Sequence, residues 1–406
     1  MKLFPNLVTA VSQALFEIFQ QQQYADKVIE RTLKSNPRWG ARDRGFIAES
    51  VYEIVRYKRL LETVSEITPT TPADYARIFG VWRLMRGQTL PDWYEFEGLD
   101  AEVLERRFQA VRQDRRILEA IPDWLDEVGS QELGDRWPGV LHALNEPAPV
   151  VLRVNTLKAD RKTVQEALEA EGIETETTGS HGLVLRRRQQ VFRTRAFMDG
   201  WFEMQDAASQ LVAPMLDVRP GMRVVDACAG AGGKTLHIAA LMENKGSLIA
   251  LDTEEWKLQE LKKRARRAGV FIIEPRPITS NKVIKRLHGS ADRVLLDVPC
   301  SGLGVLRRNP DAKWKLTPAF LDQVRAWQQD ILREYSLICK PGGRLVYATC
   351  SILPSENQLQ VQQFLARHGD TFTLKSEKII LPDESGYDGF YIAALERTGE
   401  APTLSA

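Results

Sequence analysis

The sequence predicts an α/β protein whose C-terminal half is a mostly parallel sheet with helices on both faces. Three observations support this. From about residue 206, short apolar runs alternate with amphipathic stretches, as in βαβ units. Residues 1–130 carry apolar side chains at helical spacing between prolines, and residues 131–205 mix strand-like and helix-like runs. We therefore expect three domains, which 406 residues are enough to build.

The first domain, over residues 1–130, is expected to be helical. Leu7, Val11, Leu15 and Phe19 recur every four residues with polar residues between them. This spacing is typical of an amphipathic helix that packs into a core, and not of a signal peptide. No apolar run approaches the roughly 20 residues that cross a membrane, so we expect a soluble protein without membrane contact.

The second domain, residues 131–205, is expected to be a small α+β subdomain. Val150–Val154 and Leu183–Leu185 read as strands, and 160–171 as a helix.

The third domain, residues 206–396, carries the α/β alternation. Asp206 is placed to cap a helix that ends near Leu216. The expected strands are Arg223–Asp226, Leu248–Asp252, Val294–Asp297, Leu345–Ala348 and Gly389–Leu395. The expected helices between them are 235–242, 254–268 and 317–339. Residues 397–406 are expected to form a flexible tail.

Composition excludes several classes of protein. A net charge of +1 means that any site for a polyanion must be a local patch. Four dispersed cysteines fit neither a disulfide framework nor a zinc ribbon, which favours a reducing, cytoplasmic compartment. The five histidines are scattered, so we expect no metal site. We also expect a monomer.

Four polar residues are predicted at the carboxyl ends of strands: Asp226, Asp252, Asp297 and Cys350. Ligands of open parallel sheets bind beyond these ends. One aspartate there is often only a helix cap. Four such residues at one edge indicate a binding site.

A glycine-rich loop, Cys228–Thr235, follows the first of these strands. Glycines let a ligand approach the backbone, and the next helix offers free N–H groups. A P-loop would need glycine at Cys228, and a dinucleotide fingerprint would need glycine at Thr235. An adenosine-type cofactor remains, with Asp252 about 20 residues further on as the ribose-binding acid.

Two cysteines share a local pattern: Cys300 and Cys350 each follow an apolar run, and each is followed by serine. Two thiols at strand ends suggest covalent chemistry. The alternative is a small buried apolar residue. We favour that alternative for Cys339, which is expected inside the helix 317–339.

Three motifs resemble the Sun/Nop (RsmB-like) family of RNA (cytosine-5) methyltransferases. They are Asp226–Thr235, Leu295–Trp314 and Ala348–Asn357. Upstream, two stretches are similar to the family's RNA-binding lead-in, and a third to the helical NusB-like domain of some bacterial members. These stretches are Leu152–Lys158, Gln205–Ser209 and, for the helical domain, about 36–60 with Arg42–Arg44 and Arg56.

The resemblance implies a Rossmann-like class I methyltransferase domain, preceded by a NusB-like domain and an RNA-binding subdomain, with S-adenosyl-L-methionine as cofactor. It places Asp252 on the ribose and Asp297 near the transferred methyl group. The residues that it places around the methionine and ribose are Cys228, Ala229, Gly230, Ala231, Gly232, Gly233 and Lys234. Ala231 stands where the family often has proline. The family's adenine-binding acid is missing from 277–281, where Ser280 replaces part of its hydrogen bonding.

Cytosine carbon 5 is a poor nucleophile, and a thiolate added at carbon 6 makes it reactive. A cationic environment near Lys234 would lower the thiol pKa. Asp297 is a plausible donor or relay at ring N3. Either cysteine could attack on this chemistry alone. The resemblance implies Cys350 as nucleophile and Cys300 as the residue that assists adduct breakdown.

RNA contacts are expected from basic residues near aromatic ones, since cations bind phosphates and aromatic rings stack on bases. Phe192 and Phe197 lie within the richest stretch. The candidate residues are Arg186, Arg187, Arg188, Arg193, Arg195, Arg307 and Arg308. We assign the basic run 262–267 to a solvated helix face instead.

The sequence thus predicts a cytoplasmic transferase of rRNA processing, an RNA-binding methyltransferase that makes 5-methylcytosine. One alternative is a tRNA cytosine-5 methyltransferase, and the NusB-like domain favours rRNA. The other is a non-catalytic RNA-binding ribosome-assembly factor, which would need a lost cysteine or cofactor loop. Both are intact in this chain.

Overall fold

The computed structural model describes residues 3–398, and these form two compact units. One unit combines the chain up to Glu146 with Leu306–Thr317. The other combines Pro147–Val305 with the chain from Pro318 onward. The expected boundary near residue 130 falls inside a helix, Asp123–Leu133, and the three-domain division stays a prediction.

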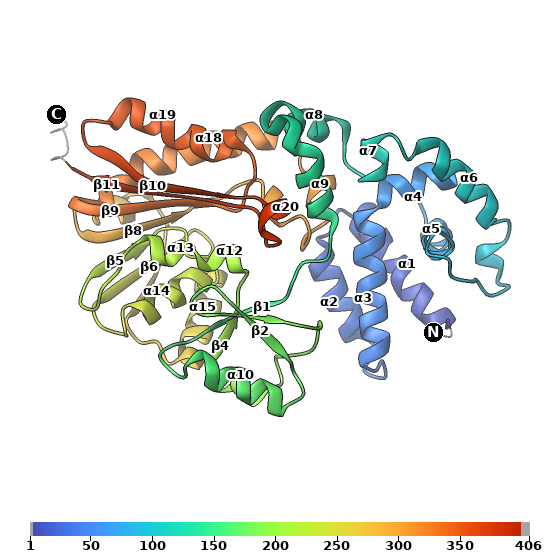
Figure 1. Cartoon of the computed structure of the whole chain (residues 1–406), viewed down its shortest axis with the longest axis horizontal. Helices are drawn as coiled ribbons and strands as arrows, with labels where there is room; N and C mark the ends of the chain where they lie inside the picture. The colour runs from blue at the N-terminus through green and yellow to red at the C-terminus, as the bar shows by residue number, and fades with distance from the viewer. Residues whose placement is uncertain (1–2, 399–406) are drawn as a thin grey trace. The chain divides into compact units, whose positions relative to one another are not determined.

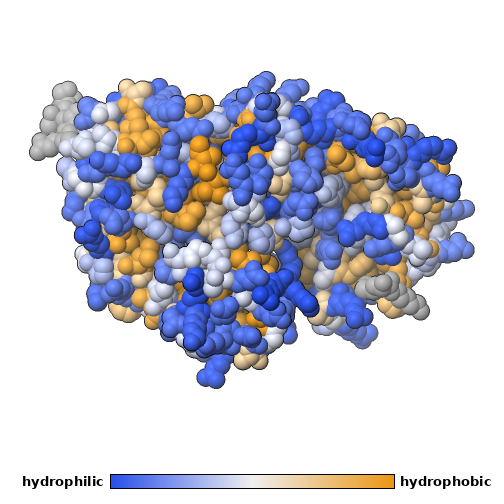
Figure 2. Space-filling model, viewed as in Figure 1, coloured by the Kyte–Doolittle hydropathy of each residue, from blue (hydrophilic) through white to orange (hydrophobic). Residues whose placement is uncertain are grey.

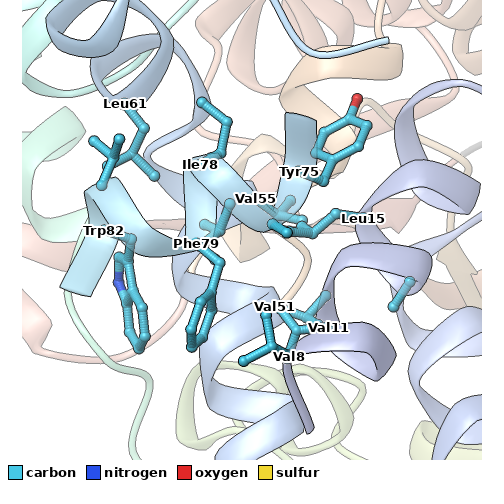
Figure 3. Close-up of a cluster of buried hydrophobic side chains, with 14 of the residues drawn as sticks. Val8, Val11, Leu15, Val51, Val55, Leu61, Tyr75, Ile78, Phe79 and Trp82 are labelled. Carbon is cyan, nitrogen blue, oxygen red and sulfur yellow. The ribbon is translucent and has the colours of Figure 1, made fainter. Parts of the chain in front are cut away.

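The first unit is helical (Figure 1). Its helices are α1 (Pro5–Phe19), α2 (Ala25–Ser35), α3 (Ala41–Arg56), α4 (Lys58–Ser65), α5 (Pro72–Met85), α6 (Ala101–Val111), α7 (Arg115–Leu118), α8 (Asp123–Leu133), α9 (Trp137–Asn145) and α17 (Ala312–Lys315), with 3₁₀ turns at Tyr94–Phe96 and Gly134–Arg136. Figure 3 shows apolar side chains of α1, α3 and α5 packed together, Val11, Val51 and Phe79 among them. The expected apolar face of α1 is therefore confirmed.

The segment Leu306–Thr317 is part of this helical core although it comes late in the chain. The indole of Trp314 donates a hydrogen bond to the Val55 carbonyl at 2.7 Å. The guanidinium of Arg56 donates to the Arg307 carbonyl at 3.0 Å.

The second unit begins with a four-stranded antiparallel sheet in the order β2-β3-β1-β4. Its elements are β1 (Val151–Val154), α10 (Arg161–Ala170), β2 (Thr175–Thr178), β3 (Gly182–Leu185), α11 (Arg195–Met198) and β4 (Phe202–Met204). Val164 and Leu168 of α10 pack against Leu152 of β1 in a small core. The two strands and the helix expected in this subdomain are confirmed.

A seven-stranded sheet follows, in the order β10-β11-β9-β8-β5-β6-β7. Its strands are β5 (Arg223–Asp226), β6 (Ser247–Asp252), β7 (Ile273–Pro277), β8 (Ala291–Asp297), β9 (Cys339–Thr349), β10 (Phe372–Ile380) and β11 (Phe390–Arg397). β7, β6, β5, β8 and β9 are parallel, and β11 runs antiparallel to both of its neighbours. This is the mostly parallel sheet that the strand–helix alternation predicts.

Helices cover both faces of this sheet, as expected (Figure 1). α13 (Val212–Met215), α14 (Gly233–Leu241) and α15 (Glu255–Ala268) pack on one face. α16 (Asn281–Lys285), α18 (Pro318–Tyr335) and α19 (Gln358–His368) pack on the other. The remaining short elements are α12 (Ala207–Gln210), α20 (Pro382–Ser385) and 3₁₀ turns at Leu303–Val305, Ser336–Ile338 and Pro354–Glu356.

Two expected helices differ from the structure. The helix expected over 317–339 ends at Tyr335, and Cys339 begins β9. Placing Cys339 inside a helix was therefore wrong: its pairing with Ala291 of β8 overrides the helical pattern, although the side chain is buried as expected. The helix after Asp206 is split into α12 and α13, because Pro214 has no N–H to bond the Gln210 carbonyl.

Two edge strands, β7 and β10, were not among the expected strands. β7 contains Pro275 and Pro277, and β10 is largely exposed, so neither has the apolar pattern of a buried strand. At the C-terminus, Arg397 still belongs to β11, and the Thr398 N–H donates to the Thr371 carbonyl at 2.8 Å, so these two residues of the expected tail are bonded to the fold. The remaining residues of that tail, 399–406, lie outside the described part of the chain.

The described residues on the face shown in Figure 2 are mostly hydrophilic, with hydrophobic side chains in smaller groups between them. In the described part of the chain, no helix is long and apolar enough to span a membrane.

Candidate active site

Four predicted residues meet at one edge of the seven-stranded sheet. Asp226, Asp252 and Asp297 are the last residues of β5, β6 and β8, and Cys350 follows the end of β9. These strands are parallel neighbours, so their carboxyl ends share an edge. The pairing of Asp297 with Ala348 places the two cysteine-bearing loops side by side.

The glycine-rich loop leads directly into α14. Gly230 and Gly232 have positive φ angles of 55° and 88°, which glycine adopts without strain. A Cβ atom on Gly232 would lie 2.0 Å from Leu261 Cδ1 of α15. The loop therefore packs so closely on α15 that a side chain at this position would have to displace Leu261.

Asp252 fixes this loop. One of its carboxylate oxygens accepts the Gly230 N–H at 2.8 Å, and the other accepts the Glu254 N–H at 2.8 Å. Each oxygen has a second lone pair, so the carboxylate keeps the capacity to accept two hydroxyl groups.

Lys234 and Asp297 form an ion pair. Lys234 Nζ lies 2.7 Å from Asp297 Oδ2 and 5.1 Å from the centre of the Phe390 ring. Burial lowers the pKa of the Lys234 ammonium, but the charge and hydrogen bond of Asp297 outweigh burial and leave that pKa above its usual range. The Lys234 ammonium therefore stays charged at this edge of the sheet.

The two cysteine sulfurs are in contact. Cys300 Sγ lies 3.3 Å from Cys350 Sγ, within hydrogen-bonding distance for sulfur, and both residues are partly exposed. The hydrogen bond with Cys350, together with burial, holds the pKa of the Cys300 thiol well above its usual range. The Cys300 thiol is therefore held in its protonated form.

Three other residues near the edge differ in their surroundings. Burial raises the pKa of Asp226 to about 7, and Thr235 donates to one of its oxygens at 2.7 Å. Burial also raises the pKa of the Cys228 thiol well above its usual range. Ser280 is exposed and comes just before α16, after the end of β7.

Arg153 holds the glycine loop, with Gln205 as its second partner, and neither was predicted as a site residue. The buried guanidinium of Arg153 donates to the Gly233 carbonyl at 2.5 Å and to Gln205 Oε1 at 2.6 Å. Both lie in the stretches that resemble the RNA-binding lead-in. A buried arginine in a strand is a signal for such a role, because a buried charge needs partners.

The arginine candidates fall into two groups. Those between residues 186 and 195 are all exposed in the second unit, although Arg186 is paired with Glu174 and Glu176. Arg307 belongs to the helical unit, where it is buried and donates to the Ala143 carbonyl at 2.7 Å. The structure therefore does not bring Arg307 to an RNA-accessible surface. Arg308, next to it, is only partly exposed.

Comparison with known proteins identifies the family. The model of the 16S rRNA methyltransferases RsmB/F matches residues 213–396, and that of an RsmF/B-like ferredoxin-like domain matches 121–192. The chain is 33% identical to the probable ribosomal RNA small subunit methyltransferase B of Synechocystis, over 94% of this chain and 97% of the relative. It is 36% identical to the protein of the same name from Bacillus subtilis, over 95% and 98%.

The chain belongs to the RsmB/F methyltransferase family. Among solved structures, PH0851 matches with a TM-score of 0.83 at 25% identity, over 98% of this chain and 100% of that chain. The resemblance drawn from the three motifs is thus confirmed, as is the Rossmann-like fold.

The cofactor of this RsmB/F family member is S-adenosylmethionine, and the sheet edge fits it. The glycine loop leaves room for a ligand against the backbone, and Asp252 offers a carboxylate to a pair of hydroxyls. In the described part of the chain, no cluster of three histidine, cysteine or acidic residues could hold a metal ion.

Proposed function

We propose that this protein methylates carbon 5 of a cytosine in ribosomal RNA, through a covalent cysteine adduct. The observation that carries the proposal is the contact between the Cys300 and Cys350 sulfurs, at the edge where Lys234 pairs with Asp297. Ribosomal RNA is proposed because two full-length relatives bear that substrate in their names. A reducing cytoplasmic compartment, which would keep both thiols free, is part of the proposal.

S-adenosylmethionine would supply the methyl group from its sulfonium centre. We assign its methionine and ribose to the loop 228–234, the ribose hydroxyls to Asp252 and part of the adenine to Ser280. Asp297 would border the transferred methyl group. The backbone N–H groups at the start of α14 and the close packing of Gly232 support this assignment.

Cys350 is proposed as the nucleophile. Its thiolate forms a bond to carbon 6 of cytosine, and the electron pair of the C5–C6 double bond shifts toward ring N3. Asp297 would relay a proton to N3, taking it from the Lys234 ammonium with which it is paired, and the Lys234–Asp297 pair thus balances the negative charge that develops there. The high pKa of Cys300 supports this choice, because Cys300 would stay protonated beside the Cys350 thiolate.

Carbon 5, now electron-rich, would take the methyl group, whose bond to the sulfonium sulfur would break with its electron pair left on that sulfur. A base then removes the carbon 5 proton, the C–H electron pair restores the C5–C6 double bond, and the C6–sulfur bond breaks with its pair on Cys350. Cys300 is proposed to assist this last step, since its S–H lies 3.3 Å from the departing sulfur.

RNA would bind through exposed arginines of the second unit, namely Arg186, Arg187, Arg188, Arg193 and Arg195. Arg308, in the helical unit, stays a separate candidate. Arg307 is not included, because its guanidinium is buried and bonded to Ala143.

The test is transfer of labelled methyl groups to 16S rRNA and to a tRNA pool, followed by mapping of 5-methylcytosine. We expect 5-methylcytosine in rRNA with the natural chain and none with Cys350→Ala. Transfer to tRNA alone would favour the tRNA alternative. Binding of rRNA without any transfer would favour the assembly-factor alternative and overturn the enzyme proposal.

A further inference from the structure

A buried carboxylate lies between the two cysteine loops. Glu356 ends the 3₁₀ turn Pro354–Glu356 that follows Cys350, and its side chain is fully buried. Neither cysteine contacts this carboxylate through a hydrogen bond that the structure records. Its partners are the serines that follow the two cysteines, together with Gln328 of α18.

The serines that follow the two cysteines bind Glu356 in the same way. Ser301 Oγ and Ser351 Oγ each donate to Glu356 Oε1 at 2.5 Å. Each hydroxyl also accepts a backbone N–H from two residues further on, Leu303 at 3.4 Å and Leu353 at 3.1 Å. The two loops thus contain matching turns, joined through one carboxylate oxygen.

The other oxygen of Glu356 secures the Cys300 loop on both sides. It accepts the Ser301 N–H at 2.7 Å and Gln328 Nε2 at 3.1 Å. Gln328 of α18 also donates to the Pro299 carbonyl at 3.0 Å. The residues before and after Cys300 are therefore both fixed.

The neighbouring residue, Asn357, secures the Cys350 loop in a similar way. Its carbonyl oxygen accepts Thr349 Oγ1 at 2.5 Å, and its amide donates to the Ser351 carbonyl at 3.0 Å. Cys350 lies between these two fixed residues. Of these two neighbouring residues, Glu356 is the one whose side chain bonds to both cysteine loops.

The chemistry requires a carboxylate at this position. Four donors converge on the Glu356 side chain, and a carboxylate offers two acceptor oxygens with lone pairs for all of them, whereas an amide offers one. Hydrogen bonds to a charged acceptor are the stronger kind, so the carboxylate holds the two loops more firmly than a neutral group would.

We infer that Glu356 is a positioning residue that holds the Cys300 and Cys350 loops together, so that the two sulfurs stay 3.3 Å apart. The structural part of this inference concerns the thiols alone. Its consequence for turnover rests on the proposed cytosine-5 reaction, in which both thiols act on one base.

The direct test measures the closeness of the thiols without RNA or cofactor. Phenylarsine oxide binds two neighbouring thiols at once, so its affinity for the full chain reports how well Cys300 and Cys350 are held together. A Cys300→Ala variant, which keeps Cys228 and Cys339, gives the background. We expect Glu356→Ala to weaken specific binding about tenfold or more, because four donors lose their acceptor.

The matched control is Tyr347→Phe. The Tyr347 hydroxyl donates to the Glu356 backbone carbonyl at 2.7 Å, so this change removes a buried hydrogen bond at the same residue and spares the carboxylate. We expect arsenical binding to stay within about twofold of the natural chain. An equal loss in Tyr347→Phe and Glu356→Ala would mean that general packing holds the thiols, which would overturn the inference.

Milder variants keep the test decisive if Glu356→Ala does not fold, as judged by circular dichroism. Ser351→Ala removes only the hydrogen bond from the Cys350 loop to Glu356, and Glu356→Gln keeps one acceptor oxygen. Both should weaken arsenical binding by about two- to tenfold. Binding at the natural affinity in these folded variants would contradict the role of Glu356.

Activity gives a second, separable result. In Glu356→Gln, kcat for methyl transfer should fall about tenfold or more, with KM for RNA nearly unchanged, because the RNA-binding arginines are untouched. An equal rise in KM would indicate a general structural defect and contradict positioning. If the natural chain transfers no methyl group to cytosine, the proposed function fails, while arsenical binding still decides the inference.

Discussion

The sulfur atoms of Cys300 and Cys350 lie 3.3 Å apart, although 50 residues separate them in the chain. Their strands, β8 and β9, are parallel neighbours, so both loops leave the sheet at the same edge. When one thiol bonds to a carbon atom of a bound base, the other thiol thus lies next to the new carbon–sulfur bond. Removing one thiol is therefore expected to impair a different step of the proposed reaction from removing the other.

Cys300→Ala should accumulate a covalent complex with RNA, and Cys350→Ala should form none. The first variant can still attack carbon 6 but loses assistance in breaking the C6–sulfur bond, whereas the second cannot attack. Denaturing gel electrophoresis of the enzyme with labelled rRNA and cofactor would measure the complex. The double variant is the control, and a complex that persists only in Cys350→Ala would exchange the two roles.

The place of several candidate residues at the sheet edge could be predicted, because it depends on local pattern alone. Asp252, Asp297 and Cys350 each end an apolar run, and parallel strands bring such ends to one edge. The buried position of Arg307 could not be predicted, because it depends on the segment Leu306–Thr317 packing with helices more than 150 residues earlier in the chain.

The role of Glu356 was missed for a similar reason. The serine after each cysteine was visible in the sequence, but the carboxylate that joins Ser301 to Ser351 is seen only when the loops lie side by side. Cys339 was placed wrongly for the same reason: its local pattern is helical, but the chain there pairs with β8. Tertiary contacts, rather than local preference, decided all three positions.

Replacing Gly232 should damage the cofactor loop, and replacing its neighbour should not. Gly232→Ala introduces a left-handed residue, at about 1–2 kcal/mol, and overpacks Leu261, at about 1–3 kcal/mol. Gly233→Ala is the matched control, because its new Cβ would have only Gln205 Nε2, at 3.9 Å, within reach. Urea unfolding without cofactor would measure both. Equal stabilities would show that the loop tolerates a side chain at either position.

Asp226 should make the stability of the protein depend on pH. Its pKa is about 7 in the folded protein and 3.8 ordinarily, so between these values the folded state holds a proton that the unfolded state has released. The free energy of unfolding therefore falls as pH rises through this window. Asp226→Asn removes this titrating group. We expect the free energy of unfolding of the variant to exceed that of the natural chain by about 1–4 kcal/mol near pH 8, and to differ little from it near pH 4. Parallel pH profiles for the two proteins would contradict the buried, protonated state.

The arginine candidates should separate into RNA-binding and structural residues. Arg307→Ala removes the buried hydrogen bond to the Ala143 carbonyl and should lower the free energy of unfolding by about 1.5–3 kcal/mol. Arg187→Ala, on the exposed stretch, should change that free energy by less than about 0.5 kcal/mol. It should instead weaken rRNA binding and reduce the slope of log affinity against log salt concentration by about one. Filter binding over a range of salt concentrations, beside urea unfolding, would measure both effects. A reduced salt slope in Arg307→Ala at unchanged stability would mean that its guanidinium reaches RNA after all.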